Sequence, residues 1–199
     1  MNYYILTDMQ NKGVIVKAED GKQYQFIPGN GWKRTAIMIS YWPEDSDKYN
    51  MYEEVTFDQA VVLLALEVAK EAHKNQKDKG GNPYINHPIK VAEMLETEDE
   101  RAVAFLHDIV EDTDITLEHL REYGFPDVIL DAVDAMTKKP YEGYDGYIER
   151  LSKNKLAVKV KIADMTHNSD ITRISNPTEK DTDRINKYKE KIEHLKNYL

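Results

Sequence analysis

Residues 105–113 read FLHDIVEDT, an apolar segment that carries four polar side chains of the kinds that bind metal ions. We expect this stretch to be helical. Residues four positions apart lie on the same face of a helix, so His107 lies near Glu111 and Asp108 lies near Asp112. Burying this much charge without a cation would cost free energy. The stretch therefore favours a metal site within a helical domain.

A His-Asp pair is by itself a weak indication, because short motifs recur by chance. Two further segments strengthen it. His87 lies in PYINHP, residues 83–88, at a predicted junction of loop and helix, although a lone histidine there is more simply a helix-start residue. Asp164 lies in KIADMTHN, residues 161–168, and aspartate is a poor residue for a helix interior. A salt bridge or polar network would explain Asp164 equally well if it stood alone.

His87, His107, Asp108 and Asp164 together offer imidazole and carboxylate ligands. This donor set suits a divalent ion such as Mn, Fe, Co or Zn. Such an ion lowers the pKa of bound water and polarises a phosphoryl oxygen, while a nearby carboxylate can orient or deprotonate the water. These residues predict metal-assisted hydrolysis at a phosphoryl group.

The chain changes character near residue 55. Before that point, short runs rich in β-branched and aromatic residues are separated by turn signals, notably Asp20-Gly21 and Gly29-Asn30-Gly31. The predicted strands are residues 3–7, 13–18, 23–28 and 35–42. We expect residues 1–54 to form a small antiparallel β module, or a partly closed barrel.

Helical periodicity dominates residues 55–199. The predicted helices are residues 57–76, one that starts at 87–88, 98–112, one capped by Thr116, 126–137, 144–153, 155–174, and one capped by Thr178 that reaches residue 198. The fold class is mainly α, an all-α helical bundle with the β module at its N-terminal end.

Composition limits the function classes. The 199 residues include 41% hydrophobic residues, no cysteine and a formal net charge of −9. The sequence has no apolar run of the roughly 20 residues that a membrane helix needs, and its start lacks the pattern of a secretory signal. The acidic charge argues against nucleic acid as a partner. An acidic protein can still bind a phosphorylated small molecule if it holds a metal and a few local cations. We expect a cytoplasmic protein, and the charged last helix is compatible with a homo-oligomer.

The order His…His-Asp…Asp resembles the HD phosphohydrolase superfamily. The similarity extends to YINHP at 84–88, HDIVEDT at 107–113 and KIAD…HN at 161–168, which resemble the hydrolase domain of the RelA/SpoT group and its small alarmone hydrolases over about residues 57–173. The resemblance implies an all-α HD bundle. It also implies Mn²⁺-dependent removal of the 3′-pyrophosphate from ppGpp or pppGpp.

By matching positions, the resemblance makes the two histidines and two aspartates named above the Mn²⁺ ligands. It assigns Glu111 and Asp112 to activating or positioning the attacking water. It assigns contacts with the nucleotide to Lys79 and Asn168.

Three positions depart from the usual pattern of this group. Asp78 stands where an arginine usually lies against the guanine, and Asp170 and Ile171 stand where an arginine and a threonine usually follow. The metal ligands are intact, so the departures affect the expected substrate: ppGpp, or a different nucleotide.

Two alternatives from other classes remain. One is a non-catalytic nucleotide-binding regulatory module, against which the intact Glu111 and Asp112 argue. The other makes the β module dominant, with nucleic acid or a partner protein as its target. Among the smaller features, we interpret His73 with its neighbouring lysines as a solvated face, and His167 as either a packing residue or a support for the metal ligands.

Overall fold

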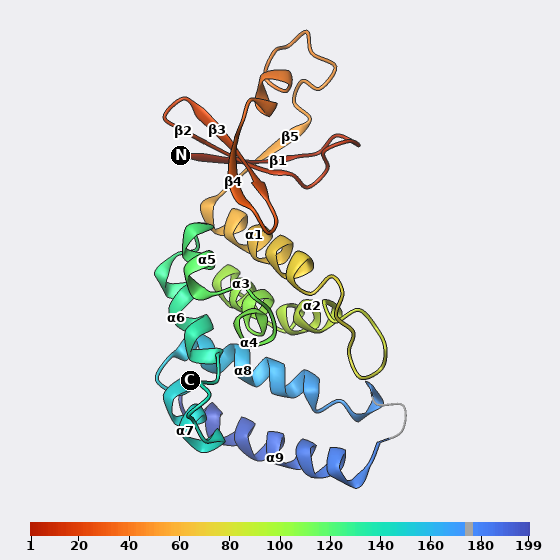
Figure 1. Cartoon of the computed structure of the whole chain (residues 1–199), viewed down its shortest axis with the longest axis vertical. Coiled ribbons are helices and arrows are strands. Elements are labelled where there is room, and N and C mark those ends of the chain that lie inside the picture. The colour runs from red at the N-terminus through yellow and green to blue at the C-terminus, as the bar shows by residue number, and fades with distance from the viewer. Residues whose placement is uncertain (174–176) are drawn as a thin grey trace. The chain divides into compact units, whose positions relative to one another are not determined.

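The computed structural model describes residues 1–173 and 177–199, and it is mainly α with a small antiparallel sheet, as the sequence predicts (Figure 1). The chain divides into two compact units, residues 1–68 and 69–199. Helix α1 (Phe57–Ala72) belongs in part to each. The domain boundary expected after residue 54 stays a prediction. Within the described ranges, no helix combines the length and apolarity that a membrane crossing requires.

The first unit contains a five-stranded antiparallel sheet in the order β4-β3-β2-β1-β5. Its strands are β1 (Asn2–Leu6), β2 (Ile15–Glu19), β3 (Lys22–Ile27), β4 (Gly31–Thr35) and β5 (Tyr52–Val55). Asp20 and Gly21 join β2 to β3 with φ values of 50° and 71°. Positive φ at both central residues is what a tight two-residue hairpin turn requires, so the predicted turn is confirmed.

The prediction of a strand over residues 35–42 is wrong. The chain leaves β4 at Thr35 and forms a short 3-10 helix, η1 (Ile37–Ser40). The strand β4 was predicted only at its last residue, Thr35, and the strand β5 was not predicted. Met38 and Tyr41 lie three residues apart, and both are fully buried. A helical turn places both side chains on the sheet, and this packing outweighs the β propensity of the isoleucines.

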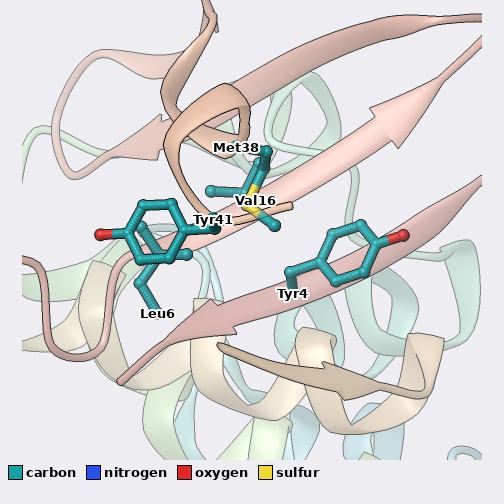
Figure 2. Close-up of a cluster of buried hydrophobic side chains, with 5 residues drawn as sticks. All are labelled: Tyr4, Leu6, Val16, Met38 and Tyr41. Carbon is teal, nitrogen blue, oxygen red and sulfur yellow. The ribbon is translucent and has the colours of Figure 1, made fainter. Parts of the chain in front are cut away.

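One hydrophobic cluster of the first unit lies on one face of the sheet. Figure 2 shows Tyr4, Leu6 and Val16 gathered with Met38 and Tyr41 in one cluster. Tyr4 and Leu6 are two residues apart on β1, and Val16 is the register partner of Tyr4. Alternate residues of a strand point to the same face, which explains why these three meet.

The second unit is helical. Its elements are α2 (Asn86–Glu93), α3 (Glu98–Leu106), α4 (Ile109–Asp112), α5 (Leu117–Glu122), α6 (Asp127–Met136), α7 (Tyr144–Leu151), α8 (Lys155–Asn168), η2 (Ile171–Arg173) and α9 (Glu179–Lys196). Helix α8 is central, since it packs against α2, α3, α6 and α9 (Figure 1). The threonine caps at Thr116 and Thr178 are confirmed, and Thr97 begins α3 in the same way.

Two of the predicted helices differ most from the observed ones. The helix expected over residues 98–112 is interrupted after Leu106 and resumes at Ile109. The helix expected over residues 155–174 ends at Asn168, and the end expected at Ile174 lies outside the described residues. The first difference shapes the candidate site.

Arg150 binds the segment that connects α6 to α7. Its guanidinium donates from Nε to Glu142 Oε1 at 2.6 Å and from Nη2 to Glu142 Oε2 at 2.9 Å. Nη2 also donates to the carbonyl of Thr137 at 2.8 Å, and the Lys139 N–H donates to Glu142 at 3.0 Å. A paired, charge-assisted contact of this kind fixes geometry as well as adding stability.

We expect Glu142→Gln to lower the melting temperature at neutral pH. Hydrogen bonds from Arg150 and from the Lys139 N–H lower the pKa of Glu142 from 4.5 to about 2. A lowered carboxyl pKa stabilises the fold fully above about pH 4.5, and this contribution disappears as the pH falls toward 2. The difference in melting temperature should therefore shrink over that interval in calorimetry. The exposed Glu149→Gln is the control, and a difference that does not change with pH would contradict the assignment.

Candidate metal centre

Side chains from three parts of the second unit converge on one point. His87 lies in the first turn of α2, His107 and Asp108 lie between α3 and α4, and Asp164 lies in α8. Each imidazole Nε2 lies 3.0 to 3.7 Å from an oxygen of each carboxylate. Metal–ligand bonds of about 2.0–2.2 Å put the ligands of one ion at such separations. The four predicted ligands are therefore brought together.

The break between α3 and α4 makes this convergence possible. Consecutive residues of a continuous helix project about 100° apart around the axis, which would separate the His107 and Asp108 side chains. At the break, Asp108 has φ −101° and ψ −7°, and its Oδ2 lies 3.0 Å from His107 Nε2. The expectation of one regular helix face was wrong at this point, although His107 and Asp108 do meet.

His107 has the chemistry of a metal ligand. Its Nδ1 lies 2.7 Å from the carbonyl of Ala104, which fixes the ring and favours a hydrogen on Nδ1. Its Nε2 is buried and makes no well-formed hydrogen bond with any described residue. Burial opposes a charge on His107, but Asp108 and Asp164 together raise its pKa well above the ordinary value. This point of the protein attracts positive charge, and a divalent cation fits it.

Neighbouring groups keep both carboxylates ionised. Burial opposes the charge of Asp164, but Lys161 and the two histidines lower its pKa well below the ordinary value. Lys161 Nζ lies 2.9 Å from Asp164 Oδ2, and Asn168 donates to Oδ1 at 2.6 Å. Burial likewise opposes the charge of Asp108, while His107 lowers its pKa to about 2 overall. The Tyr84 hydroxyl donates to the same carboxylate.

The acidic pair lies on the next turn, in α4. Glu111 and Asp112 are exposed. Glu111 Oε1 accepts a hydrogen bond from the Lys138 N–H at 2.7 Å, and the Gln76 amide donates to the Asp112 carbonyl at 2.9 Å. Desolvation and then the charge of Asp108 raise the pKa of the Asp112 carboxylate. A carboxylate held by a hydrogen bond, as in Glu111, or one with a raised pKa, as in Asp112, suits a proton acceptor.

A cavity of about 250 Å³ opens beside His87. Its lining is rich in cationic side chains and includes both residues predicted to contact a nucleotide. The lining residues are Lys77, Asp78, Lys79, Gly80, Tyr84, His87, Asn168, Asp170, Arg173 and Arg184. Four of these carry positive charge and two carry negative charge, so the cavity suits an anionic ligand.

Some residues of the site had no clear signal in the sequence. The interpretation of His73 as a solvated residue is wrong, because its side chain is 1% exposed and its Nδ1 lies 2.8 Å from Gln76 Oε1. Tyr84, Lys161 and Arg173 were not selected. Tyr84 contacts Asp108, which is distant in the chain, and no local pattern encodes that contact. Lys161 lies one helical turn before Asp164, so the spacing of these two residues could have indicated their ion pair.

His167 proves to be a neighbour of the ligands. Its Nδ1 lies 2.7 Å from Nδ1 of His87, and the two rings stack with an interplanar angle of 18°. Burial, and then the charge of Arg173, lower the pKa of His167 to about 4. Of the two interpretations left open, support for a ligand agrees with this position.

We expect Asp164→Asn to abolish binding of a divalent ion, since it removes a ligand charge at the centre of the cluster. Calorimetric titration of the unmodified protein with a series of first-row divalent ions should give one site per chain. Asp114→Asn, an exposed carboxylate close to α4, is the control and should bind normally. Circular dichroism would verify the fold, and normal binding by Asp164→Asn would exclude the cluster as the site.

Comparison with known proteins agrees with the fold. A family model described as an HD domain matches residues 65–141. The Drosophila melanogaster guanosine-3′,5′-bis(diphosphate) 3′-pyrophosphohydrolase MESH1 is 31% identical over 145 residues, which cover 67% of this chain and 81% of that protein. The Danio rerio MESH1 is 51% identical over 69 residues, which cover 31% of this chain and 38% of that protein.

A solved structure described as "A metazoan ortholog of SpoT hydrolyzes ppGpp and plays a role in starvation responses" matches with a TM-score of 0.58 and 26% identity. The match covers 71% of this chain and 88% of that one. Some relatives are far longer: the alignment to a probable guanosine-3′,5′-bis(diphosphate) 3′-pyrophosphohydrolase of Synechocystis spans 17% of that protein at 33% identity. On these similarities, the chain belongs to the HD-domain family, in the branch that includes the MESH1 proteins.

Proposed function

We propose that this chain is a metal-dependent phosphohydrolase of nucleotides, and specifically a guanosine-3′,5′-bis(diphosphate) 3′-pyrophosphohydrolase. The observation that carries the proposal is the convergence of two imidazoles and two carboxylates beside a cavity lined by cations. The names of the relatives support the choice of substrate. The proposed organisation is a β module, residues 1–54, followed by the HD-type domain, residues 55–199.

His87, His107, Asp108 and Asp164 are the proposed ligands, and Mn²⁺ is the proposed ion. A mixed set of imidazole and carboxylate donors also accepts Fe, Co or Zn, so these ions belong in the same test. When bound, a divalent ion of this kind polarises a phosphoryl group and lowers the pKa of water. The remaining chemistry falls to side chains of the chain itself.

Glu111 and Asp112 are the proposed catalytic pair. The hydrogen bond from the Lys138 N–H holds Glu111, and the raised pKa of Asp112 favours uptake of a proton. In the reaction, the oxygen of water bonds to the phosphorus on the 3′-oxygen, and the bond from that phosphorus to the 3′-oxygen breaks. A carboxylate of the pair takes a proton from the water, and the 3′-oxygen leaves with a proton, so that diphosphate is released.

Lys79 and Asn168 are the proposed contacts with the nucleotide, since both line the cavity beside His87. The nucleotide is the proposed partner. Asp78 supports an alternative in which the same chemistry acts on a different nucleotide. Its carboxylate accepts hydrogen bonds from the N–H groups of Gly80 and Asn82, each at 2.9 Å, so it shapes the loop and does not supply a cation.

The decisive experiment measures release of pyrophosphate from ppGpp, and from a set of other nucleotides, with Mn²⁺ or with EDTA. We expect activity with Mn²⁺ that Asp108→Ala removes together with metal binding. Glu111→Gln and Asp112→Asn should lower kcat by about 10²–10⁴-fold, the usual contribution of a general acid or base, while Mn²⁺ still binds. The exposed Glu122→Gln is the control.

The outcomes separate the alternatives. Activity on other nucleotides alone would keep the chemistry and exclude ppGpp. A protein that binds metal and nucleotide without turnover would be a regulatory binding module.

A further inference from the structure

The second nitrogen of His87 faces another histidine. His87 Nε2 lies 3.2 Å from Asp164, toward the proposed metal, while its Nδ1 lies 2.7 Å from Nδ1 of His167. Two imidazole nitrogens at this distance share one hydrogen, so one donates and the other accepts. A neutral imidazole that offers the Nε2 lone pair to a metal carries its hydrogen on Nδ1. His87 therefore donates, and His167 accepts.

The contacts of Arg173 lead to the same position for the hydrogen of His167. Its Nη1 lies 3.1 Å from His167 Nδ1 and 3.1 Å from the His167 carbonyl oxygen. It also lies 3.4 Å from the amide oxygen of Asn168. A guanidinium group can only donate hydrogen bonds, so His167 Nδ1 must present a lone pair to it. Both donors face the single lone pair of His167 Nδ1. The contact with Arg173 assigns the hydrogen of His167 to Nε2, and the contact with His87 agrees when His87 is a metal ligand.

The carboxylate of Asp78 lies close to the guanidinium of Arg173. The loop fixes the Asp78 carboxylate, because Oδ1 accepts the N–H groups of Gly80 and Asn82 at 2.9 Å. Its other oxygen, Oδ2, lies 3.9 Å from Nη2 of Arg173. An arginine at position 78 would instead place like charge beside Arg173. This contact gives the departure at position 78 a physical reason.

We propose that Asp78 and Arg173 act as positioning residues that fix the tautomer of His167 and thereby aim Nε2 of His87 at the metal. The inference rests on the proposed role of His87 as a ligand. It extends the contacts that support His87 from the ring of His167 to Arg173 and, beyond it, to Asp78. Loss of such outer contacts typically weakens metal binding by about 10–100-fold.

The main test is whether Arg173→Met raises or lowers the affinity for Mn²⁺. Removal of a positive charge near a cation should tighten binding through electrostatics, whereas loss of the positioning contact should weaken it. We expect Arg173→Met and His167→Phe to weaken Mn²⁺ binding about 10-fold or more in calorimetry. Lys77→Met, a cation in the lining of the same cavity, should leave the affinity unchanged or raise it. Unchanged or tighter binding by Arg173→Met would overturn the proposal.

A double substitution tests whether Asp78 acts through Arg173. Asp78→Asn should weaken Mn²⁺ binding in the unmodified protein and have little further effect when combined with Arg173→Met. Equal losses in both backgrounds would mean that Asp78 acts only through its charge, and would remove it from the chain of contacts.

A measurement without metal separates this inference from the proposed function. Long-range ¹H–¹⁵N correlation spectra of the metal-free protein should show His167 protonated on Nε2 and bare on Nδ1, and Arg173→Met should disturb this pattern. A hydrogen on His167 Nδ1 in the unmodified protein would overturn the positioning chain even if the protein binds metal. Failure of the unmodified protein to bind any divalent ion would overturn the proposed function, while the tautomer would still report on the contacts.

Discussion

The repulsion between a buried carboxylate, that of Asp164, and a partly buried one, that of Asp108, is the constraint on which the second unit depends. Asp108 and Asp164 both face His87 and His107, and each carboxylate remains ionised in spite of burial. Lys161 offsets part of this charge from its place on α8. What remains unbalanced favours a cation at the centre, since buried charges are tolerated only when they are paired or bind metal. This unbalanced negative charge would destabilise the fold without a cation, and it gives the proposed enzyme its affinity for metal.

The helices provide rigid supports for these groups. Helix α8 carries Asp164, Lys161 and Asn168 within two turns, and it packs against four neighbouring helices. The break between α3 and α4 turns two consecutive side chains toward a common point, which a regular helix would not do. A site built on packed helices holds its ligands within narrow limits, as metal binding and catalysis require.

Loops around the ligands supply further side chains of the site. The loop over residues 77–83 supplies both a cation of the cavity, Lys79, and the carboxylate of Asp78, which contacts Arg173. The proposed contacts with substrate and the proposed support of His87 therefore share one short segment. A substitution of Asp78 is expected to affect metal affinity and one of Lys79 recognition of the nucleotide, and measurements of both would separate the two effects.

The sequence by itself determined the helical class, the threonine caps, the Asp-Gly hairpin and the identity of the residues that cluster. These features depend on local propensity, or on rare residue types in apolar surroundings. The tertiary structure decided the rest. The break at His107-Asp108, the burial of His73 and the contact of Arg173 with Asp78 all depend on packing between segments far apart in the chain. Local patterns carry no information about such packing, because its free energy arises only when the segments meet.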